Sequence, residues 1–291
     1  MSLARALDLP GGMPGISPDI YGKADFTAVA AIVHAEAGIV LPSGKAMLVY
    51  SRLAPLVRET ASGTFALYLD KVRADPAECA RMIAALTTNH TFFYREAHHF
   101  EHLAREVRPG LLRRLEQRQP VRIWSAGCSS GEETWSLVMT LLGPDRAEGR
   151  RIAARDLRVL ASDIAPKPVE RASQASYPAR DLEPVPAALR DAWTQATGEN
   201  RIVGEDARAV VRFRLLNLLG EWPMRGPFQA IFCRNVMIYF DNPTKERLVA
   251  RFAAMLEPGG HLYIGHSERV TGPAASLLQP VGPTIYRRQG T

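Results

Sequence analysis

Apolar residues recur at helical spacing along the first part of the chain. Within residues 25–38 they fall at the i, i+3, i+4 and i+7 positions that share one face of an α-helix: Phe26, Val29, Ala30 and Val33. Gly38 marks the expected end of this helix. The same pattern continues at residues 45–59, 64–72 and 75–89. No strand pattern precedes residue 121, so the sequence predicts an all-helical N-terminal region.

After residue 120 the pattern changes to strands that alternate with helices. Six apolar stretches are typical of strands: residues 121–127, 157–163, 210–219, 228–236, 261–266 and 284–288. Helical patterns lie between several of them, at residues 132–142, 166–174 and 244–256. This alternation predicts a parallel sheet covered by helices on both faces, with an antiparallel edge formed by the last two strands. Residues 176–208 break the alternation and indicate an insertion with a short hairpin.

These patterns divide the chain into four parts. We expect a flexible tail at residues 1–23, an all-helical domain at 24–88, a helical linker at 89–120 and an α/β domain at 121–291. The fold class of the last part is a doubly wound, Rossmann-like sheet with a small β insertion at about residues 176–213.

Composition and charge narrow the class of protein. The chain has 291 residues, of which 46% are hydrophobic and 23% charged, as in a globular protein with a buried core. No apolar run reaches the roughly 18 residues of a membrane span, and the N-terminus lacks the apolar core of a secretory signal. Three widely spaced cysteines fit a reducing cytoplasm, where we expect the protein to be located. The net charge of +6 fits either a solvated, arginine-rich surface or an acidic partner.

Residues 127–131 have the pattern G-x-S-x-G, which allows two kinds of site. In a hydrolase, Ser129 would be the nucleophile. Its acid and base would come from two pairs of candidates, Asp163 or Asp241 and His261 or His266. However, the motif ends the first strand of the predicted sheet, whereas several strands precede a nucleophile elbow. Two carboxylates also follow the turn at once and would oppose a developing oxyanion, so the hydrolase interpretation is disfavoured.

The same turn fits a nucleotide-type cofactor. Gly127 and Gly131 let the backbone bend sharply and approach a ligand closely. Neither a dinucleotide fingerprint nor a P-loop is present. Glu132 and Glu133 favour a cationic ligand group such as a sulfonium, or they are ordinary first-turn charges of a helix. With Asp163 ending the next strand, where an acid accepts ribose hydroxyls, the pattern suggests S-adenosylmethionine.

Six stretches in one order make this interpretation specific: LTTNHTFFYREAHHF (86–100), WSAGCSSGEE (124–133), LASDI (160–164), FRLLNLL (213–219), IFCRNVMIYFD (231–241) and GHSE (265–268). Through them the chain resembles the CheR family of chemotaxis methyltransferases over about residues 24–288. The resemblance implies an enzyme of sensory adaptation and signal transduction. It would transfer a methyl group from S-adenosylmethionine to glutamate carboxylates of chemoreceptors, with S-adenosylhomocysteine as product and no metal.

The turn and the resemblance together place the site residue by residue. The expected cofactor-binding positions are Asn89, Thr91, Arg95, Gly127, Glu132, Glu133, Asp163, Asn217, Leu218, Arg234 and Asn235. Asp163 would bind the ribose, and Asn217 with Leu218 the adenine side. Arg95 and Tyr239 would lie near the transferred methyl, Arg95 to position the carboxylate and Tyr239 to shape the methyl channel. Which of the two adjacent glutamates makes the main contact stays open.

The resemblance also implies the partner, the cytoplasmic helical bundle of a chemoreceptor. Family members that bind a receptor's C-terminal pentapeptide have a longer loop in the β insertion, and residues 197–203 are about three residues shorter than that loop. The chain therefore resembles the pentapeptide-independent type, and we expect a monomer with no nucleic-acid partner and no membrane insertion. His98, His99 and His102 have metal-like spacing but no fourth ligand. Two alternatives stay open, a methyltransferase with another target and a non-catalytic cofactor-binding signalling module.

Overall fold

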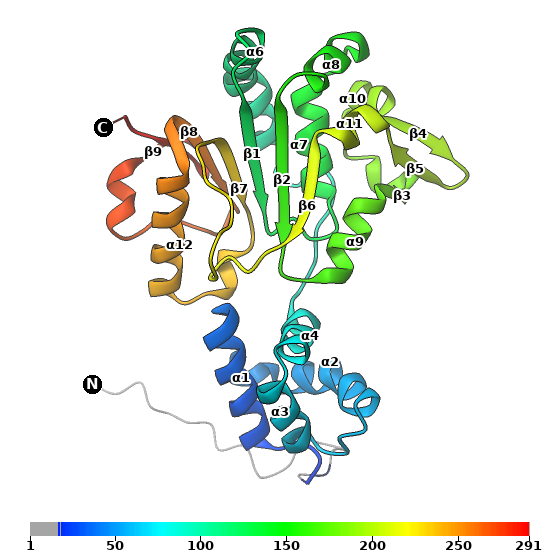
Figure 1. Cartoon of the computed structure of the whole chain (residues 1–291), viewed down its shortest axis with the longest axis vertical. Coiled ribbons are helices and arrows are strands. Elements are labelled where there is room, and N and C mark those ends of the chain that lie inside the picture. The colour runs from blue at the N-terminus through cyan, green and yellow to red at the C-terminus, as the bar shows by residue number, and fades with distance from the viewer. Residues whose placement is uncertain (1–16, 18, 291) are drawn as a thin grey trace. The chain divides into compact units, whose positions relative to one another are not determined.

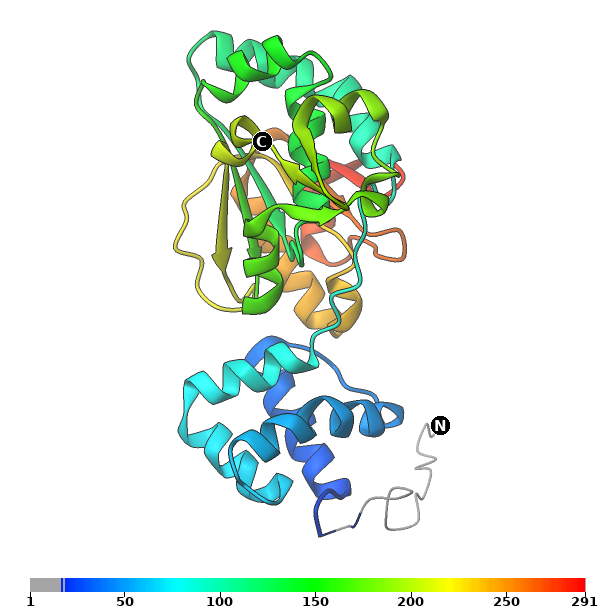
Figure 2. The same cartoon turned by 90° about the vertical axis from the view of Figure 1, so that its right-hand side faces the viewer.

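The computed structural model describes residues 17 and 19–290, so most of the tail expected at residues 1–23 lies outside the described residues. The described chain forms two compact units that divide between Thr88 and Asn89. Figures 1 and 2 show the first, helical unit in blue to cyan and the second, α/β unit mainly in green to red.

The helical unit confirms the pattern of its sequence. Its elements are α1 (Lys23–Ala37), η1 (Ser43–Lys45), α2 (Ala46–Glu59), α3 (Phe65–Ala74) and α4 (Pro76–Leu86). Gly38 ends α1 with a φ of +68°, a left-handed conformation that glycine adopts without strain. The side chains of Thr64 and Asp75 cap α3 and α4 by accepting backbone N–H groups. Apolar side chains of one face per helix, such as Val33 and Leu53, form the fully buried core.

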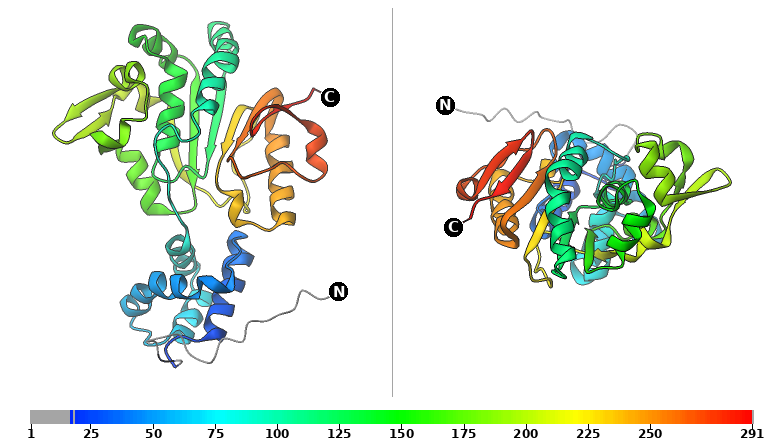
Figure 3. Two further views of the ribbon diagram at one scale, coloured as in Figure 1. Left: turned by 180° about the vertical axis from the view of Figure 1, so that it is seen from behind. Right: turned by 90° about the horizontal axis from the view of Figure 1, so that it is seen from above.

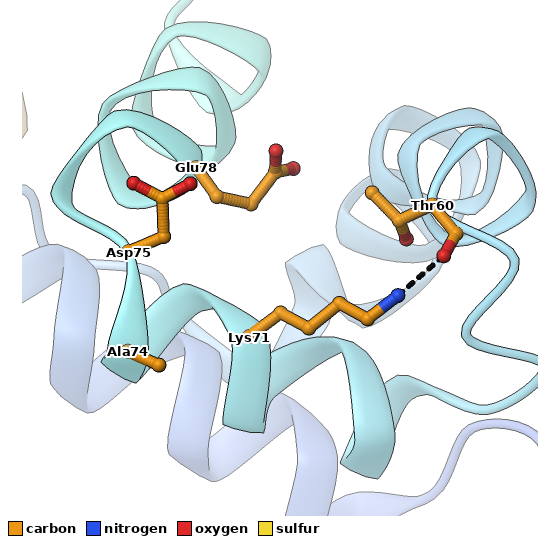
Figure 4. A pocket seen from close by; sticks show the side chains of 5 residues that line it. All are labelled: Thr60, Lys71, Ala74, Asp75 and Glu78. Carbon is orange, nitrogen blue, oxygen red and sulfur yellow. Dashed lines mark hydrogen bonds between the residues drawn. The ribbon is translucent and has the colours of Figure 1, made fainter.

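A shallow hollow in this unit is lined by Thr60, Lys71, Ala74, Asp75 and Glu78 (Figure 4). The Lys71 ammonium donates to the carbonyl of Thr60, just after the C-terminal end of α2, where carbonyls lack helical partners. The buried carboxylate of Glu78 accepts from the Tyr68 hydroxyl and from Arg81, both at 2.8 Å. The polar groups at the hollow therefore join helices to one another.

The α/β unit is built on a seven-stranded sheet with the order β6-β2-β1-β7-β8-β10-β9. The strands are β1 (Val121–Ala126), β2 (Leu157–Asp163), β6 (Val211–Leu215), β7 (Phe228–Cys233), β8 (Leu256–Ile264), β9 (Leu278–Gly282) and β10 (Ile285–Arg288). The strands from β6 to β8 in this order are parallel, and β10 pairs antiparallel with β8 and β9. The predicted doubly wound sheet with an antiparallel edge is confirmed.

Helices cover both faces of this sheet. They are α5 (His98–His102), the π-helical turn η2 (Leu103–Val107), α6 (Arg108–Glu116), α7 (Glu132–Leu142), α8 (Arg146–Ala153), α9 (Pro166–Gln174) and α12 (Asn242–Met255). On one face, Trp135 of α7 packs against Phe213 of β6. On the other, Phe252 of α12 packs against Trp124 of β1. Because these strands are buried on both sides, their sequences are nearly continuous apolar runs.

The insertion is a small three-stranded antiparallel sheet with the order β3-β5-β4. It contains β3 (Ser176–Pro178), η3 (Ala179–Leu182), α10 (Ala187–Trp193), β4 (Thr194–Thr197), β5 (Asn200–Val203) and α11 (Glu205–Ala209). β4 and β5 form the predicted hairpin, joined by Gly198 and Glu199 alone, with a φ of +60° at Gly198. Figure 3 shows this hairpin projecting at one end of the unit, with the red C-terminal strands at the other end.

Several elements differ from the sequence prediction, among them three strands of the seven-stranded sheet. The strand expected at 210–219 ends at Leu215, because the Asn217 side chain accepts the N–H of Leu219 (3.0 Å) and turns the chain. β8 begins at Leu256 rather than at residue 261, since its Pro and Gly residues form an irregularity opposite β7 instead of a turn. β9 was not predicted because Pro280 is typical of loops, although an edge strand accommodates proline. None of the described helices is both long and apolar enough to cross a membrane.

Candidate functional site

The strand order of the sheet reverses between β1 and β7. Open α/β sheets bind ligands outside the carboxyl ends of their strands at such a switch point. Sequence-predicted residues from four strands come to this edge: Gly127 after β1, Asp163 at the end of β2, Asn217 after β6 and Arg234 after β7. The fold therefore brings segments far apart in the sequence to one edge of the sheet, and the region outside this edge, bordered by Gly127, Asp163, Asn217 and Arg234, is here called the switch-point crevice.

The turn after β1 is shaped by its two glycines. Gly127 and Gly131 have φ values of +83° and +96°. A Cβ on Gly127 would lie 2.3 Å from Cγ2 of Val236, and one on Gly131 would lie 2.6 Å from the hydroxyl oxygen of Tyr177. Both positions therefore need glycine for its backbone conformation and for its lack of a side chain.

Asp163 fastens this turn to β2. One carboxylate oxygen accepts the N–H of Ser129 (2.8 Å) and the other that of Ala165 (3.0 Å). Burial raises the pKa of Asp163, and these hydrogen bonds oppose the rise. Each carboxylate oxygen has two acceptor positions, so Asp163 can still accept ligand hydroxyls.

The hydrolase interpretation is excluded by the partners of its candidate residues. The Ser129 hydroxyl donates to the carbonyl of Asn89 (3.3 Å) and not to a histidine. Nδ1 of His266 lies 2.8 Å from a carboxylate oxygen of Glu96, and Asp241 caps α12. Ser129 is a turn residue, and its contact brings the segment of Asn89 against the turn.

The two glutamates at the start of α7 have different surroundings. The Glu132 carboxylate accepts from the hydroxyl of Ser130, the residue before Gly131, at 2.8 and 3.0 Å. The Glu133 carboxylate accepts from Ser125 of β1 (2.8 Å) and from Arg234 (3.2 Å). Burial raises the pKa of both carboxyls, opposed at Glu133 first by Arg234. Glu133 thus contacts both segments that border the switch point.

The guanidinium of Arg234 is the centre of a buried ion network. It lies 3.2 Å from the carboxylates of both Glu133 and Glu96 and donates to the carbonyl of Arg95. It also lies over the ring of Phe100, 5.4 Å from the ring centre. Only 2% of this side chain is exposed, so the guanidinium is buried among these groups.

The segment from Asn89 to Glu96 carries three of the predicted residues. Arg95 donates to the carbonyl of His90 (3.1 Å) and lies 5.7 Å from the ring centre of Phe92, which is largely exposed. Thr91 is half-buried, as is Tyr239 at the end of η4 (Met237–Tyr239). The Arg95 side chain is thus held at the surface of its own segment.

Asn217 and Leu218, the pair expected on the adenine side, lie in a loop that several contacts hold. The Leu218 carbonyl accepts from the Trp222 indole (3.1 Å) and from Arg251 (2.7 Å). Arg251 lies flat over Trp222, 3.8 Å from the ring centre. These contacts hold the loop against α12.

Two further residues of the crevice were missed by sequence reasoning, Glu96 and Glu268. The buried carboxylate of Glu268 accepts the N–H groups of Asn235 (3.1 Å), Ile238 (3.2 Å) and Gly265 (2.6 Å). It thereby joins the loop after β7 to the loop after β8. Glu96 lies in the motif REAHHF and Glu268 in the motif GHSE, and membership in these family motifs is the feature of the sequence that points to them.

The three histidines with metal-like spacing contact the C-terminal part of the sheet. Imidazole nitrogens lie 3.2 Å from the Pro283 carbonyl for His98, 2.9 Å from the Thr284 hydroxyl for His99 and 3.0 Å from the Tyr263 hydroxyl for His102. Within the described part of the chain, no group of His, Cys, Asp and Glu side chains could hold a metal ion.

The switch-point crevice has the chemistry expected for S-adenosylmethionine. Gly127 allows close approach of the backbone, and Asp163 provides acceptors for hydroxyls. Two carboxylates face the single guanidinium of Arg234, so the ion network favours a cation over a phosphate. The residues present fit the cofactor, and fold and site together define the class of S-adenosylmethionine-dependent methyltransferases.

The sequence comparisons identify the family within this class. Residues 24–87 match the family "CheR methyltransferase, all-alpha domain" and residues 89–285 match "CheR methyltransferase, SAM binding domain". A probable chemotaxis protein methyltransferase of Rhizobium etli is 42% identical over 264 residues, 88% of this chain and 96% of the relative. Chemotaxis protein methyltransferase 2 of Pseudomonas aeruginosa is 41% identical over 272 residues, 91% and 93% of the two chains.

The chain belongs to the CheR methyltransferase family. The resemblance found in the sequence is therefore confirmed, and with it the fold class, the cofactor and the activity. The protein is an S-adenosylmethionine-dependent protein-glutamate methyltransferase of chemotaxis signalling, and chemoreceptors are its substrates.

Proposed function

We propose that methyl transfer to a receptor glutamate takes place in the switch-point crevice. The observation that supports this most directly is the close packing of the turn at Gly127 against the loop after β7, beside the ion network of Arg234. The cofactor-binding residues are then those expected from the sequence: Asn89, Thr91, Arg95, Gly127, Glu132, Glu133, Asp163, Asn217, Leu218, Arg234 and Asn235. Of the adjacent glutamates, Glu133 makes the main contact, because it borders both strands of the switch point.

The chemistry places modest demands on the side chains. The bound cofactor supplies a methyl group on a positively charged sulfur, which keeps the electron pair of the broken C–S bond as a neutral thioether. The receptor carboxylate forms the new C–O bond and is already ionised, since its ordinary pKa is near 4.3. No proton moves, so the chain needs to align the partners and exclude water rather than to supply a base.

Arg95 and Tyr239 are the residues that contact the reacting groups. Among the described residues, the guanidinium of Arg95 contacts His90 and Phe92 of its own segment, so it can turn toward an incoming carboxylate. Half-buried Tyr239 lies on η4, immediately beyond the loop that Glu268 holds, and shapes the channel for the methyl group.

The partner is the cytoplasmic helical bundle of a chemoreceptor, recognised without a C-terminal pentapeptide. The two-residue turn between β4 and β5 supports this, because it leaves no long loop in the insertion to bind a peptide. The chain acts as a monomer in the cytoplasm and has no nucleic-acid target.

The test combines labelled S-adenosylmethionine with receptor fragments that carry or lack the C-terminal pentapeptide. We expect base-labile label on glutamate with both fragments, and the absence of label from both fragments would contradict the proposal. In the same assay, Arg95→Ala should reduce turnover by about 100-fold, whereas calorimetry should show a smaller effect on the affinity for S-adenosylhomocysteine, a loss of about three- to tenfold. Arg105→Ala, at an exposed position, is the matched control. Full turnover by Arg95→Ala would show that Arg95 does not position the carboxylate.

A further inference from the structure

Glu96 follows Arg95 directly, and its backbone has an unfavourable conformation that contacts with the surrounding residues must stabilise. Its φ is +59°, and that of Tyr94 on the other side of Arg95 is +56°. Residues with side chains rarely adopt this left-handed region, and those that do cluster at functional sites. The backbone on both sides of Arg95 is therefore fixed by contacts elsewhere in the unit.

On the Glu96 side of Arg95, the carboxylate of Glu96 makes these contacts. One oxygen accepts the N–H of His266 (3.1 Å), lies 2.8 Å from Nδ1 of the same residue and accepts from the Asn235 side chain (3.4 Å). The other oxygen lies 3.2 Å from the guanidinium of Arg234. His266 follows β8, whereas Asn235 and Arg234 follow β7. One side chain thus joins the segment of Arg95 to both loops at the switch point.

The same carboxylate adds negative charge to the crevice. Arg234 lies between Glu96 and Glu133, so the two carboxyl groups share one guanidinium. Only 11% of the Glu96 side chain and 12% of the Glu133 side chain are exposed, so water screens their charges weakly. Burial opposes ionisation of Glu96, but Arg234 and the hydrogen bonds from His266 outweigh it and lower the pKa of Glu96 to about 2. Glu96 is therefore ionised at neutral pH.

We propose that Glu96 is a positioning residue for Arg95 and that its charge raises the affinity of the crevice for the positively charged cofactor relative to that for the neutral product. The proposal rests on the proposed function, in which S-adenosylmethionine and S-adenosylhomocysteine bind in this crevice. The two ligands differ by one methyl group and one positive charge. A nearby carboxylate therefore acts on the sulfonium of one ligand and hardly on the thioether of the other.

The substitution Glu96→Gln removes the charge and keeps the shape of the side chain. Isothermal titration calorimetry of the full chain should show that the Kd for S-adenosylmethionine rises by about tenfold, while that for S-adenosylhomocysteine changes by less than about threefold. The ratio of the two affinities is the decisive quantity, because a purely structural defect weakens both ligands alike. An unchanged ratio, or equal loss of both ligands, would overturn the charge role.

Two more variants separate charge from position. Glu96→Asp keeps the charge but withdraws the carboxylate from Arg234 and His266, so it should keep the affinity ratio of the wild type and lower kcat by about tenfold. If Glu96→Asp keeps the wild-type kcat, the positioning role is wrong. Glu106→Gln removes an exposed carboxylate ten positions further on and should change neither quantity.

Binding measurements on the wild-type chain and on Asp163→Asn distinguish a failure of this inference from a failure of the proposed function. If it binds both ligands and Asp163→Asn weakens both, the crevice is the cofactor site whatever Glu96 does. If Asp163→Asn and Gly127→Ala leave both affinities unchanged, the proposed function fails and the inference fails with it.

Discussion

Replacing Gly127 by alanine tests whether the turn after β1 is as tightly determined as its geometry indicates. Gly127 has a φ of +83°, and an added Cβ would lie 2.3 Å from Cγ2 of Val236. A left-handed backbone costs a residue with a side chain about 1–2 kcal/mol, and overpacking of a rigid contact costs about 1–3 kcal/mol. Gly127→Ala should therefore lower the free energy of unfolding by about 2–5 kcal/mol.

Two control variants separate these contributions. Gly198 also has a positive φ, +60°, but no atom lies within 4 Å of an added Cβ. Gly198→Ala should therefore show only the backbone contribution, about 1–2 kcal/mol. Val236→Ala removes the clashing methyl group, so the double variant should be more stable than the two single effects predict by about 1–3 kcal/mol.

Denaturant unfolding followed by tryptophan fluorescence measures these free energies, and calorimetry with S-adenosylhomocysteine reports the state of the crevice. Because Val236 follows Asn235 directly, displacement of Val236 should also weaken binding, and the double variant should recover part of it. If Gly127→Ala is as stable as Gly198→Ala, the contact with Val236 does not constrain the turn and the steric reasoning is refuted.

Three more predictions concern other parts of the α/β unit. Glu268→Gln places an amide NH2 among backbone donors and should destabilise the protein by about 2–4 kcal/mol in denaturant unfolding; a loss below about 0.5 kcal/mol would contradict its role in joining the loops. Burial lowers the pKa of His99 to about 3 and that of His261 to about 4, so the fold keeps both neutral while the unfolded chain binds protons below about pH 6.5. The free energy of unfolding should fall between about pH 6.5 and 4, by up to about 1.4 kcal/mol per pH unit for each histidine, and His261→Gln should reduce that slope in a pH series. Arg251→Ala releases the Leu218 carbonyl and should weaken S-adenosylhomocysteine binding by about three- to tenfold in calorimetry, whereas unchanged affinity would separate this loop from the cofactor.

The parts of the fold that could be predicted are those fixed by burial. β1 and β2 are covered on both faces, so their sequences are apolar runs that end close to where the strands end. The edge strand β9 was harder to predict from the sequence, because it pairs on one side only and therefore tolerates Pro280. β8 was partly missed for a related reason: its Gly residues indicate a turn locally, and only pairing with β7 keeps the segment extended.

The residues of the candidate site also fall into two groups, those that could be predicted from the sequence and those that could not. Residues that act through backbone shape or position, such as Gly127 and Asp163, could be placed from the sequence, because a strand end followed by a helix start fixes where they lie. Glu96 and Glu268 could not, since a glutamate in a loop is ordinarily exposed and nothing local marks it as buried. Their importance depends on the hydrogen-bond donors that the fold brings to them from the loops after β7 and β8. Asn235, which donates to both, lies more than 30 residues from Glu268 and more than 130 residues from Glu96.

The adjacent pair Glu132 and Glu133 shows why sequence alone left one assignment open. Neighbouring residues on an α-helix point about 100° apart, so two identical side chains at a helix start face different elements. In this chain, one direction meets the hydroxyl of Ser130 in the turn, and the other meets Ser125 of β1 together with Arg234. Residue type cannot distinguish the two, because both are equally favourable first-turn charges. The direction of the helix relative to the switch point distinguishes them, and it places Glu133 in the ion network that also contains Glu96. A substitution at Glu133 should therefore alter the preference between charged and neutral ligands, whereas the same substitution at Glu132 should act mainly on the turn.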